Sequence, residues 1–92
     1  MAGEKNIGSE HRIELVEREL LSVYGVHSLG SYDEKEIRME TTDGVLAVQG
    51  DGMNIKQLNL EEGNVMIEGL IKGLVYDEKE MMRKGLWNRF LK

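Results

Sequence analysis

Imidazole, carboxylate and hydroxyl groups are the side chains here that could carry catalysis or bind a metal ion. His11 and His27 supply all the imidazole in the 92 residues. A zinc site needs three or four convergent ligands, and no cysteine or histidine pair has the spacing for one. The sequence therefore predicts no metal site and favours surface or turn positions for both histidines.

Acidic clusters, a glycine pair and three serines also lack a catalytic setting. A catalytic carboxylate needs a cleft that shifts its pKa, and a calcium loop needs a fixed spacing of oxygen ligands. A phosphate loop needs more glycines, a lysine and a following helix. We interpret these groups as solvated turns and surface hydroxyls, and we expect no enzyme activity, cofactor or small-molecule substrate. The groups are Asp33-Glu34-Glu36, Glu61-Glu62, Asp77-Glu78-Glu80, Gly50-Asp51-Gly52, Ser22, Ser28 and Ser31.

The elements that would position such groups come from a motif that occurs twice, over residues 44–60 and 63–76. Each copy has a turn glycine, an alternating apolar and polar run, a second glycine and an Ile-Lys-x-Leu-x-apolar run. Each copy is predicted to form a small β-hairpin.

Glycine and acidic residues mark regular turns along the rest of the chain, because glycine supplies the positive φ of tight hairpins. Alternation between the turns predicts an antiparallel meander or sandwich with one buried face. Residues 11–24 fit both strand and helix spacing, and their β-branched residues favour strand. The expected turns are Gly25, Gly30-Ser31, Asp33-Glu34, Asp43-Gly44, Asp51-Gly52 and Glu62-Gly63, and the expected inward residues are Ile37, Met39, Thr41, Leu46, Val48, Val65 and Ile67.

Three segments follow from composition: a polar, disordered leader over residues 1–10, a β-domain over 11–78 and a basic tail over 79–92. From Met81 onward the chain has four basic residues and no acidic one. Apolar residues recur there every three to four positions, as in a short amphipathic helix that Gly85 weakens. The tail either caps the sheet or contacts an anionic membrane surface or a partner's groove. Its candidate contact residues are Arg83, Lys84, Leu86, Trp87, Arg89, Phe90, Leu91 and Lys92.

Charge and size restrict the partners. The net charge of −5 argues against a nucleic-acid binder, because phosphate contacts need a basic face. A chain this small, without a cysteine, has self-association as a means of burying more apolar area. It also has no proline to block its edge strands, so a strand-paired homodimer is predicted. With no signal peptide and no apolar run long enough to cross a bilayer, an intracellular location is expected.

The order of residues resembles the YabP family of sporulation proteins over nearly everything except the first ten positions. Leu86-Trp87 stands where the family is expected to have two phenylalanines. The matching residues are His11-x-Ile13-x-Leu15, Arg18-x-Leu20-Leu21-x-Val23-x-Gly25-Val26, Ser31-Tyr32-Asp33, Ile37-x-Met39-Glu40-Thr41-x-x-Gly44-x-Leu46-x-Val48-x-Gly50, Leu58-x-Leu60, Gly63, Ile67-x-Gly69, Ile71-x-x-Leu74-x-Tyr76 and Lys84-Gly85-Leu86-Trp87-x-Arg89-Phe90-Leu91-Lys92.

This resemblance implies a small, non-enzymatic protein made in the mother cell of an endospore former, with a forespore-envelope protein or membrane as partner. It would act in envelope, cortex or coat assembly, and it brings no catalytic residues with it. The alternative is an intracellular adaptor module unrelated to sporulation.

Overall fold

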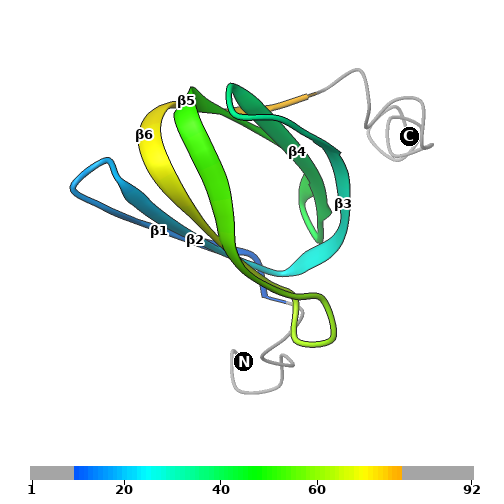
Figure 1. The fold of residues 1–92 in the computed structure, drawn as a ribbon. Helices are drawn as coiled ribbons and strands as arrows, with labels where there is room; N and C mark the ends of the chain where they lie inside the picture. The colour runs from blue at the N-terminus through cyan, green and yellow to red at the C-terminus, as the bar shows by residue number, and fades with distance from the viewer. Residues whose placement is uncertain (1–9, 78–92) are drawn as a thin grey trace.

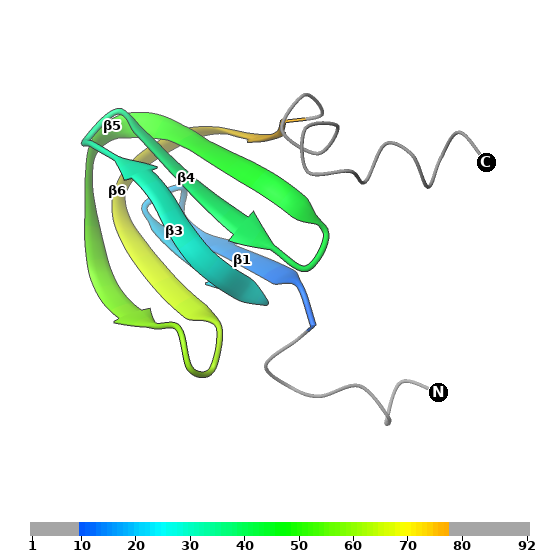
Figure 2. The same ribbon diagram turned by 90° about the vertical axis from the view of Figure 1, so that its right-hand side faces the viewer.

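The computed structural model describes residues 10–77, which form one antiparallel sheet of six strands. The strand order in space is β1-β2-β6-β5-β4-β3. Figure 1 shows the sheet curling around its own interior, and Figure 2 shows β5 and β6 bending behind β3 and β4. The strands are β1 (Arg12–Val16), β2 (Leu20–Tyr24), β3 (Val26–Tyr32), β4 (Glu36–Thr41), β5 (Gly44–Asn59) and β6 (Asn64–Tyr76). The mainly β, antiparallel prediction is confirmed. The predicted tail helix and most of the leader lie outside the described residues.

The core follows the alternation of the strands. Every residue predicted to face inward is buried, including Thr41, whose hydroxyl donates a hydrogen bond to the Gly44 carbonyl at 2.7 Å. Leu21, Val23, Val26, Met53 and Ile71 complete the cluster of buried apolar residues. Because the sheet bends around these side chains, a single curled layer encloses its own core.

The repeat was wrongly predicted to form two hairpins. Each copy is one long bent strand, and β5 and β6 pair with each other from Leu46↔Tyr76 to Asn59↔Asn64. At Asp51-Gly52 the chain does not turn back but forms an irregularity within β5. The reason lies in the β3–β4 turn, since Gly50 and Met53 donate backbone hydrogen bonds to the carbonyls of Lys35 and Glu34 (3.1 and 3.0 Å). Those contacts satisfy the backbone groups that would otherwise favour a turn.

Two glycines permit the bend where β5 crosses β6. A Cβ on Gly50 would lie 2.1 Å from the Leu70 carbonyl oxygen, and one on Gly69, whose φ is +139°, would lie 2.7 Å from the Gly52 oxygen. Any larger residue would push the two strands apart at this crossing.

Four of the other predicted turns are confirmed, and one is wrong. The chain turns at Gly25, Asp33-Glu34, Asp43-Gly44 and Glu62-Gly63, as expected. Gly30-Ser31 instead lies inside β3, whose pairing with β4 is irregular between Leu29 and Tyr32. Residues 11–24 are extended, as favoured, but they form two strands.

An unpredicted tight turn joins β1 to β2. The Glu19 amide donates to the Val16 carbonyl at 3.0 Å, and Glu17 and Arg18 both adopt left-handed φ values of 54° and 58°. Arg18 has a compensating role, because its Nε donates to the Ile71 carbonyl (3.1 Å) and its own carbonyl accepts from the Ile71 amide (2.9 Å). The turn is thereby attached to β6.

Replacing Glu17 with glycine is expected to raise the free energy of unfolding by about 1 kcal/mol, because a left-handed φ is costly for residues with a Cβ. Urea denaturation should show a higher midpoint at unchanged slope. Arg18→Gly is the matched variant, and it should gain less because it also loses the bond to Ile71. An unchanged or lower midpoint for Glu17→Gly would contradict this account.

Candidate interaction surface

The predicted tail contact residues, 83–92, lie outside the described residues, but the end of the body that precedes them is well defined. Arg38 Nη1 on β4 lies 2.7 Å from Asp77 Oδ2, and the Asp77 amide donates to the Val45 carbonyl at 2.9 Å. The hydrogen bond to Asp77 is the main cause that raises the pKa of Arg38. The last described residue is therefore attached to β4 and β5.

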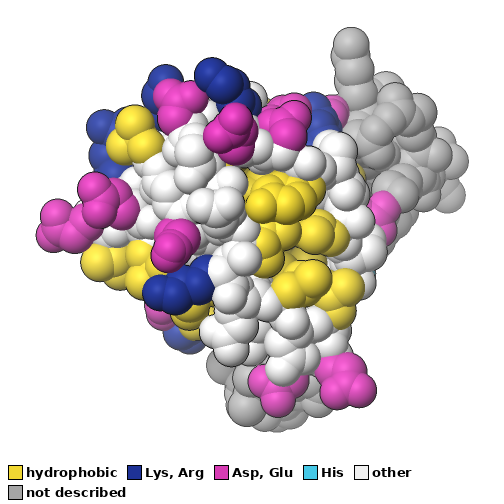
Figure 3. Space-filling model, in the orientation of Figure 1, with side chains coloured by type: hydrophobic (Ala, Val, Ile, Leu, Met, Phe, Trp, Pro, Cys, Tyr) yellow, Lys and Arg dark blue, Asp and Glu magenta, His cyan; other side chains and the backbone are white. Residues whose placement is uncertain are grey.

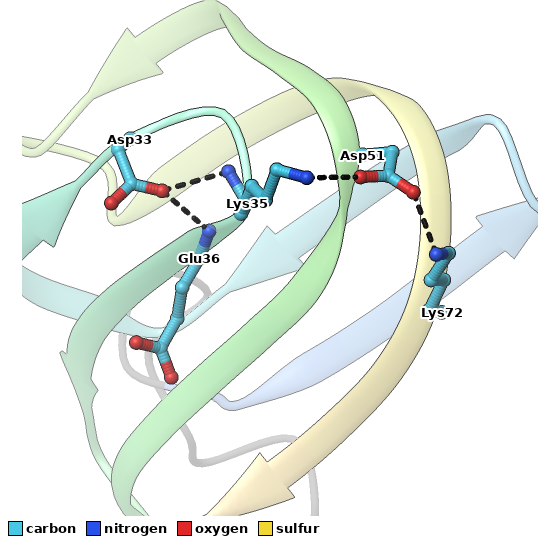
Figure 4. A network of polar contacts seen from close by, with 5 residues as sticks. All are labelled: Asp33, Lys35, Glu36, Asp51 and Lys72. Carbon is cyan, nitrogen blue, oxygen red and sulfur yellow. Dashed lines mark hydrogen bonds and ion pairs between the residues drawn. The ribbon is translucent and has the colours of Figure 1, made fainter.

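The acidic cluster at Asp33 stabilises a turn. Its Oδ1 accepts the amides of Lys35 and Glu36 at 2.7 and 2.9 Å, as Figure 4 shows. This arrangement holds the β3–β4 turn in shape. The prediction of a turn at this cluster is confirmed.

Asp51 connects three elements and was missed as a structural residue by the sequence analysis. Its Oδ1 lies 3.3 Å from Lys35 Nζ, and its Oδ2 lies 2.6 Å from Lys72 Nζ. The hydrogen bonds from Lys72 and then Lys35 lower the pKa of the Asp51 carboxyl group. No sequence spacing signals this cluster, because its members come from a turn and two different strands.

Asp51→Asn is expected to flatten the acid limb of the stability profile. The ordinary carboxyl pKa is 3.8 and the folded one is lower. The stability that this group contributes is therefore complete above the ordinary value and is lost as the pH falls through the folded value. Urea midpoints of Asp51→Asn and wild type should differ most near neutral pH and converge in acid. Glu61→Gln, in a turn outside the network, should run parallel to wild type. A gap for Asp51→Asn that is constant with pH would contradict the assignment.

His11 connects the start of the described chain to its end. Its Nδ1 donates to the Tyr24 carbonyl at 2.9 Å, which leaves Nε2 to accept the Tyr76 hydroxyl hydrogen. Burial, and then the nearby Asp43, raises the pKa of Tyr76. His27, by contrast, lies exposed on β3. Within residues 10–77, no three metal-ligating side chains come together.

Two shallow depressions lie on the outer face of β2, β6 and β5. The larger, about 520 Å³, crosses the bend and contains the ion pair of Lys56 and Glu68 (3.9 Å). The smaller, about 240 Å³, is lined mainly by neutral polar groups, among them Ser22, Gln57 and Asn59. The larger depression is open to solvent.

Large apolar side chains are exposed on β1 at one edge of the sheet, at the end of β3 at the other edge, and at the end of β5 between them. Figure 3 shows a yellow group between the positions of β5 and β3, and further yellow side chains over the β1–β2 hairpin. The exposed large apolar residues on these strands are Leu15, Val16, Tyr32 and Leu58, which are 41, 55, 48 and 47% exposed.

Comparison with known proteins connects this sheet to a family. Residues 8–83, which include all the described strands, match the sequence profile of the YabP family. The chain belongs to the YabP family. It is 33% identical to the spore protein YabP of Bacillus subtilis (strain 168) over 92 residues, which cover 98% of this chain and 92% of that protein. The expected family resemblance is thus confirmed, and the chain is a sporulation-associated YabP family protein.

For this YabP family member, residues 10–77 contain no helix with the length and apolarity needed to cross a membrane. The matched range, residues 8–83, spans all six strands of the curled sheet.

Proposed function

We propose that this chain is a non-enzymatic scaffold protein of sporulation. It acts in the mother cell as a dimer during assembly of the spore envelope, in cortex or coat formation. The observation that carries the proposal is the nearly full-length likeness to the spore protein YabP. Further support comes from the reactive groups of the body, since Asp33, Asp51 and His11 all hold strands or turns together.

In this proposal the sheet is the rigid base and the tail is the contact element. Residues 83–92 combine four cations with Leu86, Trp87, Phe90 and Leu91, a composition suited to an anionic membrane or an acidic groove of an envelope protein. A dimer presents two such tails, so weak single contacts gain avidity.

The decisive experiment is the yield of heat-resistant spores from a strain that lacks the gene. The strain is complemented with the full chain or with a chain that ends at Glu80. Rescue by the full chain alone would place the function in the tail, whereas rescue by both would place it in the sheet. A normal yield without any complementation would remove the support for a non-redundant sporulation role and favour the adaptor alternative.

Trp87→Ala combined with Phe90→Ala is expected to weaken tail binding while leaving the fold intact. Each of the two side chains contributes on the order of 1–3 kcal/mol to binding if it is fully buried in the complex. Co-sedimentation with vesicles that contain anionic phospholipid, beside neutral vesicles, measures the effect. Circular dichroism checks the fold, and unfolding of the sheet would show that the tail belongs to the core. Tyr32→Ala with Leu58→Ala, two exposed apolar residues of the body, is the matched control.

A further inference from the structure

β1 is a regular and exposed edge strand. It lies at one end of the sheet, and four of its five residues are exposed. It pairs with β2 in five consecutive register positions without a break, whereas β3, at the other end, has two register irregularities. Bulges and prolines normally protect an edge strand, and β1 has neither.

The outer edge of β1 presents the backbone groups of Ile13 and Leu15. The Glu19 amide donates to the Val16 carbonyl, so Val16 directs its backbone toward β2. Backbone groups alternate in direction along an antiparallel strand, which turns Arg12 and Glu14 toward β2 as well. The backbone amides and carbonyls of Ile13 and Leu15 therefore point away from β2, toward the open edge of the sheet.

We propose that β1 pairs antiparallel with β1 of a second copy, with Ile13 opposite Ile13 on the two-fold axis. This inference rests on the proposed dimeric scaffold and names the strand and the register. The arrangement makes one continuous sheet of two bodies and satisfies the outward backbone groups of both strands.

Charge complementarity selects this register. With Ile13 on the axis, Arg12 of each copy lies opposite Glu14 of the other, so two opposite-charge pairs form on the outer face. The two side chains already attract each other within one strand, where Arg12 Nη2 lies 2.6 Å from Glu14 Oε2. The register with Glu14 on the axis places Glu14 opposite Glu14, and like charges directly opposite are destabilising. The register with Leu15 on the axis places Glu14 opposite Val16 and forms no opposite-charge pair.

The apolar face agrees with the same register. Ile13 and Leu15 point toward the core side of the sheet, in line with Val23 and Leu21 of β2. Leu15 is 41% exposed in the single chain. In the paired form it lies diagonally beside Ile13 of the second copy, within reach of a cross-strand contact. Pairing would therefore cover apolar surface that a single chain leaves in water.

A charge-swap series on the full chain tests the ion pairs. Arg12→Glu places glutamate opposite glutamate twice, and it is expected to weaken dimerisation about tenfold in sedimentation equilibrium. Adding Glu14→Arg restores both pairs and should return the dimer to near wild-type strength. Failure of the double swap to recover would overturn the register.

A cysteine-mixing experiment tests the geometry, because the chain has no cysteine of its own. Arg12→Cys and Glu14→Cys chains are oxidised separately and as a mixture. Directly opposed Cα atoms lie within disulfide range, so the mixture should give a cross-linked heterodimer while each chain alone should not. Cross-linking by Glu14→Cys alone would show the register with Glu14 on the axis and overturn the proposal.

The outcomes separate this inference from the proposed function. A wild-type dimer whose mixed cysteine chains do not cross-link would refute the β1 interface and leave the dimeric scaffold standing. A monomeric wild-type chain at high concentration would refute both the interface and the dimer. A normal spore yield without the gene would refute the sporulation role while leaving a measured β1 dimer unaffected.

Discussion

Gly50→Ala is expected to lower the free energy of unfolding by about 3 kcal/mol or more, the largest effect of any methyl addition considered for this chain. The new Cβ would lie 2.1 Å from the Leu70 carbonyl oxygen and 3.0 Å from Met53 Sδ. The carbonyl belongs to the partner strand and cannot move without breaking the ladder. Because domains of this size are marginally stable, much of the variant should be unfolded at 37 °C. Thermal and urea denaturation followed by circular dichroism measure the loss.

Gly73→Ala is the matched control for this prediction. It places a Cβ in β6 at 3.2 Å from Gln49 Oε1, the end of a flexible side chain. The amide can rotate away, so stability should stay within about 1 kcal/mol of wild type. Equal losses for Gly50→Ala and Gly73→Ala would show that the close strand crossing is not the cause.

Ile67→Ala is expected to cost about 3 kcal/mol, because it leaves a cavity at the centre of the curled sheet. Ile67 is fully buried and lies in register between Leu21 of β2 and Ile55 of β5. Loss of its side chain removes contacts on both sides at once. The measurement is the urea midpoint at unchanged slope.

Leu58→Ala provides the comparison, because Leu58 points to the same face but is 47% exposed. Its loss should cost about 1 kcal/mol or less, since little apolar area returns to water. A large cost at Leu58 together with a small one at Ile67 would show that the core is centred elsewhere.

The alternation of apolar residues was sufficient to predict the buried face. Ile37, Met39, Leu46, Val48 and Ile67 all lie where a period of two places them, because each strand is covered on that side by its neighbours across the curl. Burial is a local property of each strand once one face is excluded from water. The presence of strands and their buried face were therefore predictable, even though the order of the strands in the sheet was not.

The turns were less predictable, because an acidic residue followed by glycine has the same local preference in a hairpin and in a bulge. At Asp43-Gly44 the chain reverses, whereas at Asp51-Gly52 it continues, and the difference lies in the distant β3–β4 turn. The Glu17-Arg18 turn was missed for a related reason. Neither residue favours a left-handed φ, and the contact of Arg18 with Ile71 that supports it joins residues 53 positions apart.

Part of the candidate interaction surface was predictable from the sequence, and part was not. The basic, aromatic composition of residues 83–92 stands out in the sequence alone. Their role as a contact element remains a prediction, because they lie outside the described residues. The Lys35, Asp51 and Lys72 cluster exists only after three separate segments meet, so charge patterning could not reveal it. The edge position of β1 likewise depends on strand order, which periodicity does not encode.

The strand order also determines when a chain leaving the ribosome can complete this fold. β3, β4 and β5 are neighbours both in sequence and in space, so they can pair as they are synthesised. The β1–β2 hairpin, although made first, has only β6 as its neighbour in the sheet, and β6 is made last. Until β6 emerges, β2 and β5 each keep an unpaired edge, the condition in which strands associate with wrong partners. Translation that stops before Tyr76 would therefore release an aggregation-prone chain, and completion of β6 closes the body just before the tail is synthesised.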